Sequence, residues 1–432
     1  MPNPPPAVPA PSRSAGFGLK RVSSGVLGYA SGLPLLLVGS TFAFWLRESG
    51  VSVQVIGLLS WASIAYSLKF LIAPAMDAYS LGPLGRALGR RRAWIFAAQV
   101  CVAVGLAAMA FGDPAANLTL AAIGCFATAA ASATQDAAVD GWRVEAAGPD
   151  EQGLLVAAYQ LGYRLAMLTA GAGALYLATG FGWIGAYGGM AAIMALVALL
   201  TLTVIPSTDR DAARPEPTSA ASALAAPLRD LVALVAATPI TTLALIGLYR
   251  VPDQLANVMS SPLYKDLQFT NIEIANVTKI FGVILGIAGA FLGGFLLKSF
   301  SLKTVLIIGI VASSATNLFY TALAATGHSI AMLTATISFD NVASAVAGTA
   351  LIAFMSKLAA SEFSATRYAV LSSIYALPGH LLAGGSGFGV AAVGYGPYFV
   401  ITFLTGLPAL LLCLWLPRES RGPKTAAAET AA

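Results

Sequence analysis

Charged side chains inside long apolar runs are the residues of this sequence that could do chemistry. One run ends in ATQDAAVDGWR, which places Asp136, Asp140 and Arg143 at positions i, i+4 and i+7, on one face of a helix. A charged group in a membrane is costly unless it faces a partner or a water-filled cavity, so each is a functional candidate. The stripe is typical of a proton relay or a gate. A structural ion pair with Arg143 is the alternative for either acid.

Two arginines lie deep in other apolar runs. Arg164 is about twelve residues, or about 18 Å, from the end of its run, too deep for its side chain to reach the membrane surface easily. A fixed guanidinium there could bind a carboxylate or phosphate through two parallel hydrogen bonds, and a salt bridge to Asp136 is the alternative. Arg250 and Asp253 lie one turn apart around Pro252, which frees a backbone carbonyl and predicts a break in the helix.

The remaining candidates are two lysines, an acid with its neighbour, and a histidine. Lys69 is close enough to the end of its run to extend to the membrane surface, and Lys279 lies in the eighth run. Asp340 precedes Asn341: a neutral Asp hydrogen-bonded to this Asn would be tolerated, and a titrating Asp could couple protons. His380 could be a pH-sensitive ligand or a packing residue.

The charges inside the apolar runs balance, four basic against four acidic. An anionic substrate could therefore bind the cations while the carboxylates take up protons. The predicted proton-coupling residues are Asp136, Asp140 and Asp340. The predicted substrate-binding residues are Lys69, Gln135, Tyr163, Arg164, Arg250, Asp253, Lys279, Asn341 and His380, whose polar members suit a sugar or peptide ligand.

The elements that must position these residues are membrane helices. Charged residues make up 10% of the 432 residues and apolar residues 57%, whereas soluble domains carry about a quarter charged residues. The mean hydropathy of +0.78 likewise indicates a polytopic membrane protein. The three cysteines lie in apolar runs, and the sequence has no metal-spaced cluster, nucleophile elbow or P-loop. We therefore expect no disulfide framework, metal or cofactor.

Twelve runs are long enough to span a bilayer as helices, which takes roughly 20 apolar residues. They predict an all-α membrane protein with two six-helix halves. The expected divisions are a disordered cytoplasmic tail (1–24), an N-terminal bundle (25–205), a polar cytoplasmic linker (206–237), a C-terminal bundle (238–416) and a cytoplasmic tail (417–432). The runs are 25–46, 53–74, 93–111, 116–140, 153–178, 183–205, 238–260, 274–297, 304–325, 330–357, 368–390 and 397–416.

Basic residues in the loops predict the orientation of these helices. Of the 24 lysines and arginines, eighteen lie on the side shared by both termini, and only Arg47 and Lys265 lie on the opposite side. Both termini are therefore predicted to be cytoplasmic. The net charge of +5 needs no nucleic-acid partner, because the lipid bilayer explains where the basic residues lie.

The two halves also repeat in sequence. At an offset of 218, Pro34 falls on Pro252 and Ile56 on Ile274. At an offset of 214, a set of glycines repeats: Gly171, Gly173, Gly180 and Gly182 fall on Gly385, Gly387, Gly394 and Gly396. Two six-helix halves in parallel repeat indicate the major facilitator fold, with a substrate site near the midplane between the halves.

Longer motifs resemble one family of that fold over nearly the whole chain. GYASGLPLLLVGSTFAFWLRESG, SLKFLIAPAMD, ASATQDAAVDGWRVE and LGYRLAML, followed in the second half by YRVPD, Lys279, FDN and FSATRYAVLS, are similar to the AmpG-type muropeptide permeases of the major facilitator superfamily. Asp77 followed by Arg90, Arg91 and Arg92 resembles the acidic-to-basic gating loop of that superfamily, with a longer spacer. With Arg143, these are the predicted gating residues.

The resemblance implies proton-driven import of N-acetylglucosaminyl-1,6-anhydro-N-acetylmuramyl peptides across a bacterial inner membrane, by a carrier that we expect to be monomeric. Arg164, Arg250 and Lys279 would hold carboxylates of this anionic glycopeptide, while Asp136 and Asp140 exchange protons. Acetyl-coenzyme A and siderophores are alternative cargoes, because related permeases carry them. A membrane-embedded cell-wall enzyme is disfavoured, since the external loops are short and hold few catalytic candidates.

Overall fold

The computed structural model describes residues 17–68, 71, 72, 76, 79–146, 149–207, 229, 233, 236, 238–359 and 364–416. All regular secondary structure within these ranges is helical. The predicted tail 417–432 and most of the predicted linker 206–237 lie outside the described residues, as do Lys69 and Asp77.

The first half contains helices from α1 to α10, with short turns of another helical type between α3 and α4 and between α9 and α10. The turn η1 is a 3₁₀-helix and η2 is a π-helix. The elements are α1 (Phe17–Val38), α2 (Ser40–Glu48), α3 (Val53–Leu59), η1 (Ser60–Ser63), α4 (Ile64–Ser67), α6 (Gly82–Leu88), α7 (Arg90–Gly112), α8 (Pro114–Ala146), α9 (Pro149–Leu168), η2 (Thr169–Gly173) and α10 (Ala174–Thr203).

The second half repeats this plan from α12 to α21, again with one π-helical turn, η4. The elements are α12 (Ile240–Leu248), α13 (Val251–Asp266), α14 (Asn271–Ile274), η4 (Ala275–Phe281), α15 (Gly282–Ser299), α16 (Leu302–Thr326), α17 (Ile330–Ala359), α18 (Ser364–Ala383), α19 (Ser386–Val393), α20 (Tyr395–Leu404) and α21 (Leu407–Trp415).

Each of the twelve predicted runs is helical over most of its described part, and short turns divide the helix in the runs 25–46, 368–390 and 397–416. Among the described residues, nine helical stretches are long and apolar enough to cross a membrane. The number is below twelve because Leu154–Thr203 is one stretch that covers two predicted runs, while Val53–Ser67 is short. Another run is split where α12 ends and α13 begins. At the N-terminus α1 starts at Phe17, so the described part of the predicted tail, residues 17–24, is helical and not disordered.

The predicted break in the seventh run is confirmed. Arg250 has φ −108° and ψ 4°, outside the helical region, and separates α12 from α13. Pro252 lies in the first turn of α13 and has no N–H, so the carbonyl of Leu248 loses its usual helical donor. The side-chain amide of Asn317 donates to the Pro252 carbonyl at 3.3 Å, which fixes α16 against the broken helix.

Small residues bring neighbouring helices into close contact. A Cβ on Gly28 would lie 2.1 Å from the carbonyl oxygen of Tyr159, and a Cβ on Gly162 would lie 1.9 Å from that of Gly25. Only glycine fits at both positions, so α1 and α9 pack backbone to backbone, which is the usual mode of helix association in membranes.

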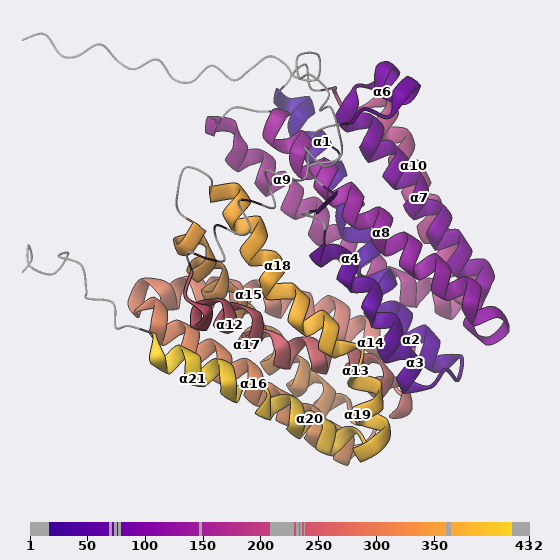
Figure 1. The fold of residues 1–432 in the computed structure, drawn as a ribbon. Coiled ribbons are helices and arrows are strands. Elements are labelled where there is room, and N and C mark those ends of the chain that lie inside the picture. The colour runs from indigo at the N-terminus through magenta and orange to yellow at the C-terminus, as the bar shows by residue number, and fades with distance from the viewer. Residues whose placement is uncertain are drawn as a thin grey trace, which may run out of the picture.

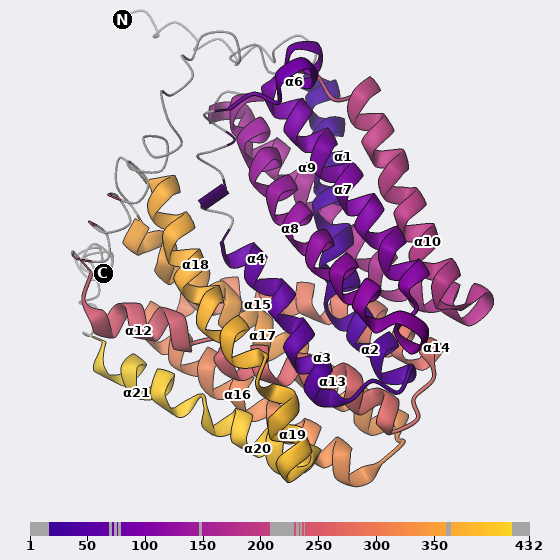
Figure 2. The ribbon, with the colours of Figure 1, turned by 45° about the vertical axis from the view of Figure 1, so that its right-hand side comes forward.

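Figures 1 and 2 show two helical bundles that meet along one region. There α2 contacts α13, α3 contacts α19, α4 contacts α18, and η2 contacts η4. We call the face that carries the turns at Gly50, Gly182, Gln268 and Gly394 the turn face, and the opposite face, which carries α6, the linker face. In both views the bundles lie together near α2, α3, α13 and α19 and diverge toward α6.

Candidate functional site

A cavity of about 460 Å³ lies between the two halves, level with the π-helical turn η4. Its lining comes from α1, α2, α3, η1 and α9 on one side and from α13, η4, α15, α16, α17 and α18 on the other. A cavity therefore lies between the two halves, where the sequence predicted the site. Four predicted site residues line it: Lys279, Asp340, Asn341 and His380.

The two walls of the cavity differ in chemistry. The N-half wall is mainly apolar and includes Leu35, Leu36, Val38, Phe42, Ala43, Leu46, Ile56, Leu59 and Met167, with Ser40, Ser60 and Ser63 as its polar groups. The C-half wall carries most of the polar groups: Gln254, Asn257, Ser260, Ser261, Tyr264, Thr278, Lys279, Tyr320, Asp340, Asn341 and His380. A ligand that fills this space must present a polar face to the C-half.

Lys279 is the cation that reaches the cavity wall within the described chain. The π-helical turn η4 carries it, and its Nζ donates to the Ser40 hydroxyl of the N-half at 2.7 Å. None of the ion pairs between described residues includes Lys279. Its aliphatic stem lies against Gly171 of η2, where an added Cβ would be 3.1 Å from Cδ. The ammonium group is thus held across the interface with a single neutral partner.

Asp340 faces the cavity from α17. Its two carboxylate oxygens accept hydrogen bonds from the hydroxyls of Thr316 and Tyr320, each at 3.2 Å. The expected hydrogen bond from Asn341 is wrong: that amide donates to the Ile337 carbonyl of its own helix at 3.0 Å. Adjacent residues on a helix point about 100° apart, so Asn341 turns toward Gly282 instead.

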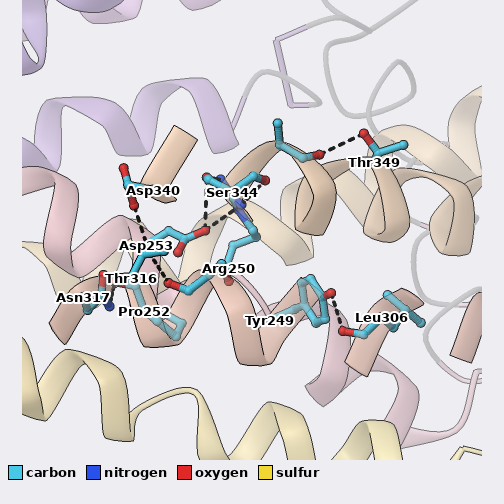
Figure 3. Close-up of polar contacts among 12 residues, drawn as sticks. Tyr249, Arg250, Pro252, Asp253, Leu306, Thr316, Asn317, Asp340, Ser344 and Thr349 are labelled. Atoms are coloured by element: carbon cyan, nitrogen blue, oxygen red, sulfur yellow. Dashed lines mark hydrogen bonds and ion pairs between the residues drawn. The ribbon is translucent and has the colours of Figure 1, made fainter. Parts of the chain in front are cut away.

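Arg250 and Asp253 lie behind this wall and do not line the cavity. Their ion pair has an Nη1–Oδ2 distance of 2.6 Å, and Asp253 is only 3% exposed. Arg250 also donates to the carbonyl and the hydroxyl of Ser344, both at 2.8 Å (Figure 3). The predicted direct contact of this pair with substrate is therefore not what the structure shows. The pair ties the start of α13 to α17, next to Asp340.

His380 joins the two halves at the edge of the cavity. Its Nδ1 lies 2.9 Å from the Ser67 hydroxyl of α4, while the ring belongs to α18. This hydrogen bond is compatible with a neutral imidazole in either tautomer, because a hydroxyl can donate or accept.

The acids predicted on α8 belong to a different cluster. Asp136 lies close enough to the phenols of Tyr159 and Tyr163 to interact with them electrostatically, and it does not line the cavity. Gln135 is completely buried beside it in the chain. Asp140 forms the ion pair with Arg143 that was the structural alternative, at 3.1 Å. The stripe thus lies inside the N-half, apart from the cavity.

Arg164 is the largest departure from the sequence-based site. Its side chain is exposed, it does not line the cavity, and among the described residues it forms no ion pair with Asp136. Among the described residues the predicted salt bridge to α8 is not formed, and the predicted contact with substrate stays a prediction. Its neighbour Tyr163 is partly buried and packs against Tyr159, with ring centroids 6.2 Å apart.

The arginines predicted to form a gate make contacts within the first half. Arg91 bonds Glu145 of α8 through Nη2 at 3.0 Å, and Arg90 lies 3.8 Å from the same carboxylate. Arg92 donates to the carbonyl of Leu202 at 2.6 Å and so caps the end of α10. These contacts hold α7, α8 and α10 together at the linker face.

Two ion pairs that join the halves at the turn face were not predicted. Arg47 of α2 bonds Asp266 of α13, and Glu48 bonds Lys265. The sequence signal was present: a basic residue is followed by an acid at 47–48 and again at 265–266, and these are the two basic residues assigned to the side opposite the termini.

Comparison with known proteins agrees with this architecture. Residues 24–251 match the Major Facilitator Superfamily. The chain is 34% identical over 391 residues to a protein of Escherichia coli K12 named anhydromuropeptide permease, covering 90% of this chain and 78% of that one. It is 31% identical to a protein of Rickettsia conorii named putative transporter AmpG 4, with 90% and 95% coverage.

Solved structures show the same fold at lower identity. A D-xylose-proton symporter superposes with a TM-score of 0.66 at 15% identity, covering 94% of this chain and 98% of that one. The nucleoside transporter NupG gives 0.61 at 16% identity, with 91% and 98% coverage. The chain is a multi-pass membrane transporter, not an enzyme, and it belongs to the AmpG-type permeases of the major facilitator superfamily.

Proposed function

We propose that this chain imports anhydromuropeptides into the bacterial cytoplasm by alternating access, coupled to protons. The name of the E. coli relative supports this substrate class. The observation that carries the proposal is Lys279, a cavity-lining cation whose ammonium group donates a hydrogen bond to a hydroxyl. A carboxylate of the peptide stem is the ligand group that this position fits.

The binding step follows from hydrogen-bond strength. An ammonium group has three donors, and Ser40 accepts one of them. Charge-assisted hydrogen bonds to a carboxylate are roughly twice as strong as those to neutral groups. A ligand carboxylate therefore displaces or joins Ser40 at Lys279. A single cavity cation among the described residues suits a glycopeptide carboxylate better than the clustered phosphates of acetyl-coenzyme A.

The proton step follows from the charge of the cavity. Lys279 and Asp340 balance each other in the described lining. An arriving ligand carboxylate would leave one uncompensated negative charge in a poorly solvated space, which is costly. Protonation of Asp340 removes that charge, so ligand and proton are bound together at the lowest cost. The hydroxyls of Thr316 and Tyr320 can hydrogen-bond either protonation state of Asp340.

The two walls then orient the ligand. Sugar hydroxyls and peptide amides meet the amides and hydroxyls of the C-half, including Gln254, Asn257 and Asn341. The acetyl and lactyl methyl groups meet Leu36, Phe42 and other apolar side chains of the N-half. We place the turn face outside the cell and both termini inside, from the distribution of basic residues, and we propose a monomer in the inner membrane.

The test is uptake by the purified chain in liposomes under an imposed proton gradient. Labelled anhydromuropeptide, acetyl-coenzyme A and a ferric siderophore are compared, with Lys279→Met as the binding variant and Lys298→Met, an exposed lysine on α15, as its matched control. We expect intact anhydromuropeptide to accumulate in the parent and the Lys298 variant but not in the Lys279 variant. Accumulation of either other cargo instead, or full uptake by the Lys279 variant, would overturn the proposal.

A further inference from the structure

Four charged residues join the halves at the turn face, and we call them the latch quartet: Arg47, Glu48, Lys265 and Asp266. Arg47 bonds Asp266 through two parallel hydrogen bonds, Nε to Oδ1 at 2.6 Å and Nη2 to Oδ2 at 2.9 Å. Lys265 Nζ lies 3.2 Å from Glu48 Oε1. Each pair takes its cation from one half and its acid from the other.

The quartet occupies equivalent positions of the sequence repeat. Arg47 and Glu48 fall on Lys265 and Asp266 at the offset of 218 that also relates Pro34 to Pro252. Because each repeat has a cation followed by an acid, an approximate two-fold relation between the halves brings each cation opposite the acid of the other repeat. Both cross-half pairs thus follow from one dipeptide pattern used twice.

The backbone turns after the quartet confirm this equivalence. Val51 N–H donates to the Leu46 carbonyl at 3.0 Å, and Phe269 N–H donates to the Tyr264 carbonyl at 3.0 Å. Gly50 has φ +80° and Gln268 has φ +63°, so both turns pass through the left-handed region at the same place. Ser52 and Thr270 then cap the next helix in each half.

Each acid of the quartet has a further donor, and these donors are also equivalent. Trp183 Nε1 donates to Glu48 at 2.9 Å, and the Tyr395 hydroxyl donates to Asp266 at 2.7 Å. Trp183 follows Gly182 (φ 70°, ψ 174°), and Tyr395 follows Gly394 (φ 79°, ψ 170°). By backbone conformation Gly182 therefore corresponds to Gly394, two residues from the Gly396 that the offset of 214 suggested.

We propose that the latch quartet is the external lock of the transport cycle: it holds the turn face closed and must break each time the halves part to admit ligand. The quartet side chains remain 27–33% exposed, so water screens both pairs and lets them separate, unlike the buried pair of Arg250. The proposal rests on the proposed function for its sidedness and for the need to open.

The test exchanges the charges within each repeat. R47E/E48R places like charges opposite each other at both contacts, and K265D/D266K does the same from the other half. The quadruple variant restores opposite charges at both contacts. A cysteine replacing Asn257, which lines the cavity, reports opening in a chain whose own Cys101, Cys125 and Cys413 are replaced, whereas uptake is measured in chains that keep Asn257. It is labelled from outside right-side-out vesicles with a membrane-impermeant maleimide.

We expect each double variant to label at least about tenfold faster than the parent and to lose uptake, because the closed state loses population. The quadruple variant should return both readouts to near the parent values, although it carries every substitution. His328→Ala, which removes a pair with Glu273 within the C-half of the same face, should label like the parent. Unchanged labelling in both double variants, or no recovery in the quadruple variant, would refute the lock. Labelling needs no substrate, so its outcome is independent of the proposed cargo.

Discussion

The two walls of the cavity come from halves with the same helical plan, yet they do different work. The C-half wall has a cation, an acid and an imidazole, in Lys279, Asp340 and His380. The N-half wall is mostly aliphatic, with Phe42 as its aromatic residue and serines as its polar groups. The repeat therefore supplies the shape of the cavity twice but its charge once, so the ligand proposed here would be bound through polar groups of one half and packed against apolar groups of the other.

The buried acids of the two halves show the same divergence. At the repeat offset of 214, Asp136 falls on Ala350, ten residues beyond Asp340 along the equivalent helix. Ten residues of helix correspond to about 15 Å. Asp340 therefore lies nearer the turn face, where ligand would enter, and lines the cavity, whereas Asp136 lies nearer the linker face and does not. In a proton path across the protein, Asp340 would come first.

Removing one member of the buried C-half ion pair should have the largest effect. Arg250→Met leaves the Asp253 carboxylate buried and uncompensated, which costs about 3–5 kcal/mol of stability. Arg164→Met, at the exposed N-half arginine, should cost little. Thermal unfolding in detergent, followed by fluorescence-detected size exclusion, measures both variants.

The double variant R250M/D253L serves as the control for Arg250. It removes both charges, so it should recover most of the lost stability, since a buried pair can be replaced by apolar groups at small cost. An Arg164 variant as unstable as the Arg250 variant would contradict the contrast between a buried, paired arginine in the C-half and an exposed arginine in the N-half.

Neutralising the cavity acid should come next in size. Asp340→Asn cannot carry a proton, so gradient-driven accumulation should fall at least about tenfold, whereas exchange of ligand between equal concentrations continues. The measurement compares imposed-gradient uptake with counterflow in liposomes. Asp136→Asn is the matched variant from the other half. If only the Asp136 variant lost accumulation, the proton site would lie in the N-half, and Asp136 would replace Asp340 as the coupling acid.

The helices were predictable because hydrophobic run length alone determines them. The break at Pro252 was predictable too, since proline removes a fixed donor. Lys279, Asp340 and His380 could be selected from the sequence because a charged group or an imidazole in a membrane helix is costly unless it faces a partner or a cavity. Arg164 met the same criterion and does not line the cavity: depth in the membrane is readable from sequence position, but the direction in which a residue faces depends on which helices pack around it.

The contacts of the site were less predictable than its members. Arg250 was expected in the cavity and does not line it. Its guanidinium is bound by Ser344 of α17 and by Asp253, and these two contacts hold it away from the cavity. No spacing rule relates residues 250 and 344. The latch quartet, by contrast, was readable from the repeated basic–acidic dipeptide once the two halves were aligned.

A methyl group added to η2 beside the Lys279 stem should have a moderate effect. In Gly171→Ala the new Cβ would lie 3.1 Å from Cδ of Lys279, so the lysine stem must shift from its position across the interface. We expect KM to rise by about threefold to tenfold with a smaller change in kcat, because the displaced ammonium group would bind the ligand carboxylate less tightly. Gly173→Ala is the control, since its Cβ would meet no atom nearer than 3.8 Å. Equal effects of the two substitutions would show that helix packing, not the lysine, causes the loss.

The smallest effect should come from Ser40, whose hydroxyl accepts a hydrogen bond from the Lys279 ammonium group. Ser40→Ala removes that partner, which raises the free energy of the ligand-free state, whereas a bound carboxylate still satisfies the ammonium group. Ligand should therefore bind more tightly, by about threefold, in line with a net hydrogen-bond contribution of about 0.5–1.5 kcal/mol. Isothermal titration of anhydromuropeptide into the purified chain measures this, with Ser63→Ala on the same wall as control. Weaker binding would mean that Ser40 contacts the ligand itself. The N-half wall would then bind the ligand through a polar group, against the contrast drawn between the two walls.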